Sequence, residues 1–266
     1  GNSMRVGVPG GRGGLVDALQ EAEMVVFWSC DPESTNSAYG GFEGTPHRLW
    51  AKELGVEFVH IDPYCSATAH LLGGRWIPVR PQTDAALAIA IMYVWATEGL
   101  YDKDYVARRT TGFDEWKAYL LGETDGIPKT PEWQEAETGV PARDVRALAR
   151  KWGGKKVYLA IGMTGAGFGG AGRGATGQQW ARSMIMMMAM QGWGKPGVNF
   201  GSLQMGAPVD MYFYFPGYAD GGISGDLQWN ANAVNNYQRM PHVLTMNPVK
   251  QMVPRQKMPD AIIDGH

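Results

Sequence analysis

The sequence predicts an α/β protein: a parallel sheet with flanking helices, followed by an irregular carboxyl-terminal region rich in Gly, Pro and aromatic residues. Apolar runs of strand length alternate with stretches of helical periodicity, at residues 24–28, 56–62 and 156–161. The second run is the most informative, because it ends at an acid, Asp62, which Pro63 follows. An acid at the carboxyl end of the second strand of an open α/β sheet commonly faces a ribose or a base. We therefore expect a nucleotide site at this edge of the sheet.

The first strand is expected at residues 24–28, which are uniformly apolar. Before it, residues 15–22 have helical spacing. The glycine-rich residues 7–14 match neither a Walker A loop nor a G-x-G-x-x-G fingerprint after a strand, so they give little support for a phosphate site. The polar loop at residues 29–35 offers the small side chains and backbone amides that a pyrophosphate needs. An ordinary strand-to-helix loop explains the same residues, and both interpretations stay open.

A crossover helix is expected at residues 46–54. Because such crossovers are right-handed, the strand at residues 56–62 should lie beside the first strand. Residues 76–79 form a short third strand, and Pro78 within it indicates an edge strand or a broken one.

The clearest helix covers residues 84–99, where apolar residues recur at helical spacing and Gly99 ends the pattern. Thr83 and Asp84 stand at its start. They either cap the helix or accept hydrogen bonds from a purine, and the sequence leaves both roles open. Further helices are expected at residues 103–109, 113–120, 131–138, 141–152 and 176–191, the last of which is Met-rich and predicted to be buried.

The periodic pattern fails after Gly192, and no convincing element longer than one turn follows. So long a stretch without regular structure is unusual in a complete compact domain. We therefore expect the chain to be part of a longer protein. A dinucleotide-binding domain is expected at residues 5–160, and residues 161–266 should belong to the next domain.

Composition excludes several classes of protein. The formal net charge is −2 and there is no long basic run, which argues against a nucleic-acid partner. The two cysteines, Cys30 and Cys65, form no C-x-x-C pair, so the chain predicts no zinc or iron–sulfur site of its own. No apolar run approaches the roughly 20 residues that span a bilayer, and no signal peptide is visible. These features favour a cytoplasmic protein without a membrane span.

A series of motifs in a fixed order resembles the large subunits of the dimethyl sulfoxide reductase family of molybdenum and tungsten enzymes. Each motif is weak alone, but their order covers about two thirds of the chain. They stand at residues 28–32, 61–63, 81–87, 98–102, 122–133, 139–142 and 194–197.

The resemblance implies a Rossmann-like domain that binds one half of a bis-molybdopterin guanine dinucleotide cofactor carrying Mo or W. By this resemblance the cofactor-binding residues are Ser29, Cys30, Ile61, Asp62, Gln82, Thr83, Asp84, Gly162 and Met163. Asp84 suits a guanine, since one carboxylate can accept from both N1–H and N2–H. By this resemblance the family's metal ligand lies upstream of this domain, so no residue here is expected to bind the metal and the chain alone is expected to be inactive. An iron–sulfur electron-transfer subunit is the implied partner, with a small molecule as substrate.

Residues 213–226 and 253–255 are similar to the transhydroxylase branch of this family. That branch implies substrate contacts near Tyr212, Tyr214 and Tyr218, whereas the simpler interpretation is that these aromatic residues only pack against other domains. Two alternatives stay open for the function: a reductase that acts on an S- or N-oxide, and a stand-alone Rossmann-like dinucleotide-binding module. A structural domain without a retained ligand site is a third.

Overall fold

The computed structural model describes residues 21–35, 44–161 and 177–201. Its centre is a five-stranded parallel sheet with the strand order β3-β2-β1-β4-β5. The strands are β1 (Met24–Trp28), β2 (Glu57–Ile61), β3 (Arg75–Ile77), β4 (Val157–Ile161) and β5 (Phe200–Gly201). This order, with the chain reversing direction across the sheet between β1 and β4, is that of a doubly wound nucleotide-binding fold. The predicted α/β class is confirmed, and β3 lies at an edge as Pro78 indicated.

Helices connect and cover the strands, and most of them match the predicted segments within two residues. They are α3 (Pro32–Thr35), α4 (Gly44–Glu53), α5 (Ala67–Leu72), α6 (Asp84–Glu98), α7 (Lys103–Arg109), α8 (Phe113–Leu121), α9 (Pro131–Thr138), α10 (Ala142–Gly153) and α11 (Gly177–Gln191). Three short elements were not predicted: α3, inside the expected polar loop, α5 and β5. The expected helix at residues 15–22 falls largely outside the described residues.

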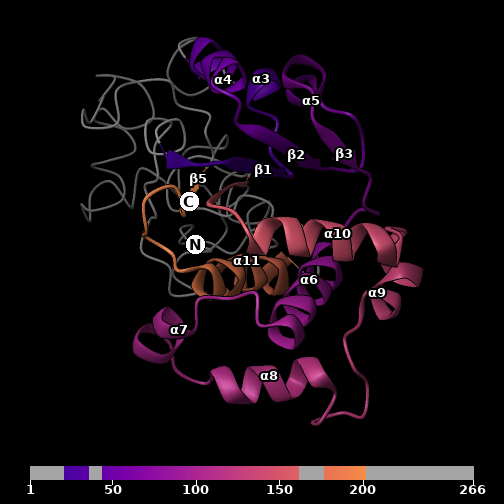
Figure 1. Cartoon of the computed structure of the whole chain (residues 1–266). Helices are drawn as coiled ribbons and strands as arrows, with labels where there is room; N and C mark the ends of the chain where they lie inside the picture. The colour runs from indigo at the N-terminus through magenta and orange to yellow at the C-terminus, as the bar shows by residue number, and fades with distance from the viewer. Residues whose placement is uncertain (1–20, 36–43, 162–176, 202–266) are drawn as a thin grey trace, which may run out of the picture.

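The sheet separates two layers of helices, as Figure 1 shows: α3, α4 and α5 cover one face, and α6, α10 and α11 cover the other. Alternate residues of β1 point to opposite layers, as the period of a strand requires. Met24, Val26 and Trp28 join the core beneath α6, whereas Val25 and Phe27 join the core beneath α4 and α5. Strand parity therefore decides which helical layer each β1 side chain can reach.

Helix α6 is the central support of its layer. It contacts α8, α9, α10 and α11, and most of its side chains are buried, which explains why its sequence is apolar around much of its circumference. The helix ends at Gly99, whose φ of 70° lies in the left-handed region that favours glycine. Its first residue, Asp84, consequently has a fixed position relative to the sheet.

Elements on both sides of residue 161 contribute to this sheet and its layers. Strand β5 pairs with β4, and α11 packs against α6. The domain boundary that we expect near residue 161 stays a prediction. Within the described part of the chain, no helix combines the length and apolarity that crossing a membrane demands.

Candidate functional site

The predicted nucleotide residues that lie among the described segments surround the carboxyl ends of β1, β2 and β3. Ser29 and Cys30 follow β1, Asp62 follows β2, and the chain runs from β3 through Gln82 into α6. Two backbone hydrogen bonds hold these exits together: Ser29 N–H donates to Ile61 O at 2.9 Å, and Asp62 N–H donates to Ile77 O at 3.3 Å. The structure thus brings the β1 and β2 loops to one edge of the sheet.

Asp84 contacts this edge through a tryptophan. The indole Nε1 of Trp28 donates to Asp84 Oδ1 at 2.9 Å. Burial raises the pKa of Asp84, and the hydrogen bond from Trp28 opposes that shift. Thr83, the N-cap residue, makes no side-chain capping bond; its hydroxyl donates to Arg80 O instead. The capping role that the sequence left open for Thr83 is therefore not observed.

Asp62 is the most deeply buried acid at this edge, with only 8% of its surface exposed. Burial raises the pKa of Asp62 to about 6, a hydrogen bond from the Tyr64 backbone opposes the shift, and the charges of Asp31 and Asp84 add to it. An ionised carboxylate in this position is under-solvated. It would gain from a ligand that donates N–H or O–H groups, such as a ribose or a purine.

Asp31, in contrast, is fully engaged by the protein. Its Oδ1 accepts from the backbone N–H and the hydroxyl of Thr68 at 3.0 and 2.6 Å, and its Oδ2 accepts from the Ser34 hydroxyl at 2.6 Å. Burial alone would raise the pKa of Asp31, but the hydrogen bonds from Ser34 and Thr68 lower it overall. The contacts with Thr68 direct the Asp31 carboxylate toward α5.

Backbone strain marks two of the predicted site residues. Among the described residues other than glycine, Ser29 and Gln82 are the two with positive φ, at 49° and 69°. Such conformations cost of order 1 kcal/mol or more and concentrate at ligand sites. The Ser29 N–H is already bonded to Ile61 O, so its exposed hydroxyl, rather than its amide, is available to a ligand.

Cys30 and His60 belong to the core. Cys30 is 2% exposed, and burial raises the pKa of its thiol far above the usual range, so the thiol stays protonated. His60 stacks on Phe27 with the ring centroids 5.2 Å apart, and its Nε2 lies 2.9 Å from Gly73 O. Burial lowers the pKa of His60, which keeps the ring neutral. His60 is therefore a buried side chain of the core beside β1.

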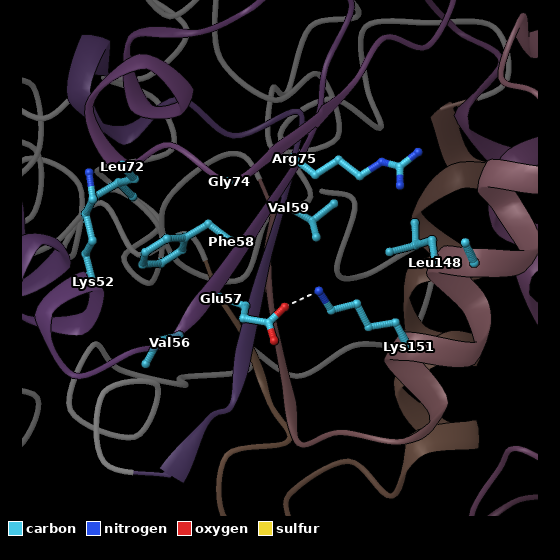
Figure 2. A pocket seen from close by; sticks show the side chains of 11 residues that line it. Lys52, Val56, Glu57, Phe58, Val59, Leu72, Gly74, Arg75, Leu148 and Lys151 are labelled. Atoms are coloured by element: carbon cyan, nitrogen blue, oxygen red, sulfur yellow. Dashed lines mark ion pairs between the residues drawn. The ribbon is translucent and has the colours of Figure 1, made fainter.

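A hollow at the opposite end of the sheet is a different feature. It lies between the start of β2 and α10, where Glu57 pairs with Lys151 (Figure 2). Glu57 begins β2 and Asp62 directly follows its end, so the two residues lie roughly 17 Å apart at about 3.3 Å per residue. Ligands of open α/β sheets bind at the carboxyl ends of the strands, so we assign no ligand to this hollow.

Five of the predicted site residues lie outside the described residues: Gly162, Met163, Tyr212, Tyr214 and Tyr218. Among the described residues, no group of three or more His, Cys, Asp or Glu side chains is arranged to hold a metal ion. Sequence reasoning missed Trp28 as a site residue. Because strand side chains alternate between faces, Trp28 shares the α6 face of β1 with Met24 and Val26, and this alternation could have identified it from the sequence.

Comparison with known proteins gives a consistent set of relatives. A model of the molybdopterin oxidoreductase family matches residues 14–262. The large subunit of pyrogallol hydroxytransferase from Pelobacter acidigallici is 49% identical over 273 aligned residues, which cover 100% of this chain and 31% of that protein. The dimethyl sulfoxide/trimethylamine N-oxide reductase of Rhodobacter capsulatus is 34% identical over 68% of this chain and 22% of its own length.

Among solved structures, acetylene hydratase from Pelobacter acetylenicus superimposes with a TM-score of 0.54 at 18% sequence identity. The superposition covers 74% of this chain and 25% of that enzyme, and it supports the fold alone. The chain therefore spans less than a third of the length of each of these relatives.

Proposed function

Since the chain belongs to the molybdopterin oxidoreductase family, we propose that it binds one guanosine end of a bis-molybdopterin guanine dinucleotide within a longer large subunit. Family membership implies a metal cofactor held by molybdopterin. The guanine dinucleotide form of that cofactor, and Mo or W as its metal, are parts of the proposal.

The observation that carries the proposal is the pair of under-solvated carboxyls, Asp62 and Asp84, at the carboxyl edge of the sheet. A guanine presents N1–H and N2–H side by side, and a ribose presents hydroxyls, so both moieties donate to carboxylates. The same two acids would repel a diphosphate. The site therefore fits the guanosine end, with the exposed hydroxyl of Ser29 and the left-handed turn at Gln82 beside it.

The bound metal would supply oxygen-atom or hydroxyl transfer, and this chain's own residues would hold and orient the cofactor. For the whole protein we favour a transhydroxylation of the pyrogallol-to-phloroglucinol type, because identity to the pyrogallol hydroxytransferase large subunit extends over the entire chain. Reduction of an S- or N-oxide is the second candidate, supported by the 34% identity to a dimethyl sulfoxide/trimethylamine N-oxide reductase. A stand-alone dinucleotide-binding module is the third.

Nucleotide binding separates the proposed guanosine site from a common dinucleotide site. Titration of the cofactor-free full-length protein with GDP, NAD and NADP should show a preference for GDP. A preference for the adenine dinucleotides would contradict the proposal.

Asp84→Ala tests the residue directly. Loss of a carboxylate that accepts two donors should cost about 2–4 kcal/mol of binding, so the cofactor content of the purified full-length enzyme should fall. Asp104→Ala, which removes an exposed acid from the first turn of α7, is the matched control for helix effects. If Asp84 only stabilises its helix, the cost would be about 1 kcal/mol of folding stability, with cofactor content unchanged.

The substrate side of the proposal concerns Tyr212, Tyr214 and Tyr218. A tyrosine hydroxyl near the substrate could exchange a proton with a phenol, because both have pKa values near 10. Each Tyr→Phe variant should be assayed with pyrogallol in the full-length enzyme. A catalytic hydroxyl should cost roughly a hundredfold in kcat with metal content kept, whereas near-normal rates in all three would leave a packing role.

The relative's description as a large subunit implies at least one further subunit. We expect that partner to be an iron–sulfur electron-transfer protein and the assembly to be cytoplasmic. Purification of the tagged full-length protein from fractionated cells, with iron analysis of the co-purifying chains, checks both expectations.

A further inference from the structure

The contact between Trp28 and Asp84 joins the central strand to the candidate guanosine site. We infer that Trp28 is a positioning residue, whose indole N–H fixes the Asp84 carboxylate in the orientation that accepts a guanine. This inference rests on the proposed function and extends it to a residue that does not itself touch the ligand.

The position of Trp28 is unusually well determined. It is the last residue of β1 and is aligned with Ile61 of β2 on one side and Ile161 of β4 on the other. Its side chain is completely buried in the core beneath α6. A donor held by a doubly paired strand and a packed core has little freedom, so an acceptor bonded to it is fixed as well.

The effect on Asp84 is both geometric and electrostatic. The indole N–H occupies one direction at Oδ1, 2.9 Å away, which sets the rotation of the carboxylate about its own axis. Burial favours the protonated form of Asp84, while this donor favours the ionised form that accepts two hydrogen bonds. Asp62, on the adjacent strand exit, is the neighbouring acid whose charge interacts with that of Asp84.

Satisfying a buried indole does not explain the contact by itself. The indole N–H of Trp152, also completely buried in this core, has no hydrogen-bond partner among the described residues, and its ring packs edge-on against Trp95. The fold thus tolerates an unbonded tryptophan N–H beneath α6. A carboxylate aligned on Trp28 at a ligand-binding edge is therefore better explained by what it does for Asp84.

The test is Trp28→Phe in the cofactor-free full-length protein, with GDP binding measured by calorimetry between pH 5 and pH 8. Loss of a hydrogen bond to a charged group should weaken GDP binding roughly tenfold to a hundredfold at pH 7. The pH at which binding is half-maximal should also rise, since Asp84 loses the donor that favours its ionised form. Trp95→Phe is the matched control. It also removes a completely buried indole that donates a hydrogen bond, at 2.8 Å to Ala149 O, but away from the site.

The possible results distinguish a failure of the proposed guanosine site from a failure of the positioning role of Trp28. Absence of GDP binding to the unmodified protein would overturn the proposed guanosine site and this inference together. Normal GDP binding with Trp28→Phe indistinguishable from Trp95→Phe would overturn the inference alone. If Trp28→Phe fails to fold, benzothienylalanine at position 28 keeps the shape and lacks the N–H. An unchanged affinity and pH profile in that variant would equally refute the positioning role.

Discussion

Replacing Asp62 by Asn should stabilise the cofactor-free protein at neutral pH and have a much smaller effect at pH 4. The carboxyl of Asp62 is 8% exposed, and its pKa rises from 3.8 in the unfolded chain to about 6 in the folded one. Asparagine keeps the shape and an acceptor for the Tyr64 N–H, and it removes only the charge.

The direction of this change in folding stability follows from the linkage between proton binding and folding. Between pH 4 and pH 6 the unfolded chain loses the Asp62 proton while the folded protein retains it, so folding stability falls as the pH rises through this window. Above pH 6 the loss is complete. Raising the pKa of Asp62 from 3.8 to about 6 corresponds to about 3 kcal/mol, which is an upper limit for the gain in folding stability of the Asn variant at pH 7.5.

Hydrogen exchange of the β1 and β2 amides, followed by mass spectrometry in the full-length apoprotein, measures this local stability. Asp31→Asn is the control, because this substitution should lower folding stability at neutral pH where Asp62→Asn should raise it. The pKa of Asp31 is lowered in the folded protein, so its carboxylate stabilises the fold at neutral pH and that contribution fades as the pH falls. If Asp62→Asn destabilised β1 and β2 at pH 7.5, or gave the same gain at pH 4 and pH 7.5, the assignment of Asp62 as an under-solvated acid would be wrong.

Three further predictions concern the surroundings of the site. At the left-handed position 82, Gln82→Gly should be about 1 kcal/mol more stable than Gln82→Ala by chemical denaturation, and equal stabilities would refute the strain. Arg48→Met should lower the unfolding free energy by about 3–5 kcal/mol, because it leaves Glu33 largely buried without its 2.6 Å partner; a loss below 1 kcal/mol would refute this. Native-state alkylation should label exposed Cys65 much faster than buried Cys30, and replacing both with Ser should leave metal content in the full-length enzyme unchanged. Loss of metal on Cys30→Ser alone would show that the ligand had been placed wrongly.

The regular elements were predictable where one physical signal dominated. Strand β1 and helix α7 match their predicted bounds because an apolar run and a capped, charged helix have clear ends. Helix α5 was missed, since its six residues are too few for a helical period to be recognised. The one sequence feature that indicates its start is Ser66, whose hydroxyl caps the helix by accepting from Ala69 N–H. Strand β5 is two residues long, and its pairing with β4 is a tertiary contact that no local pattern encodes.

The candidate site was predictable as a list of residues more than as an arrangement. The acid after the second strand and the acid at the start of α6 could be identified because strand ends and helix starts can be recognised in the sequence. The different degrees of burial of these two acids could not be predicted, because burial depends on how the helices pack around the strand ends in the folded protein. The engagement of Asp31 by Thr68 depends on α5, which the sequence did not reveal, so the role of Thr68 could not be foreseen.

The alternation of β1 side chains between two cores has a consequence for insertions and deletions. If one residue were removed from within β1 while Trp28 stayed paired with Ile61 and Ile161, every β1 residue before the deletion would move to the opposite face of the sheet and into the other core. If the register shifted instead, the indole would swing to the α4 side and lose Asp84. Reading-frame-preserving changes of a single codon in this strand should thus be far less tolerated than conservative substitutions. Chimeras between family members should exchange β1 and α6 together, because the indole of Trp28 on β1 donates its hydrogen bond to Asp84 at the start of α6.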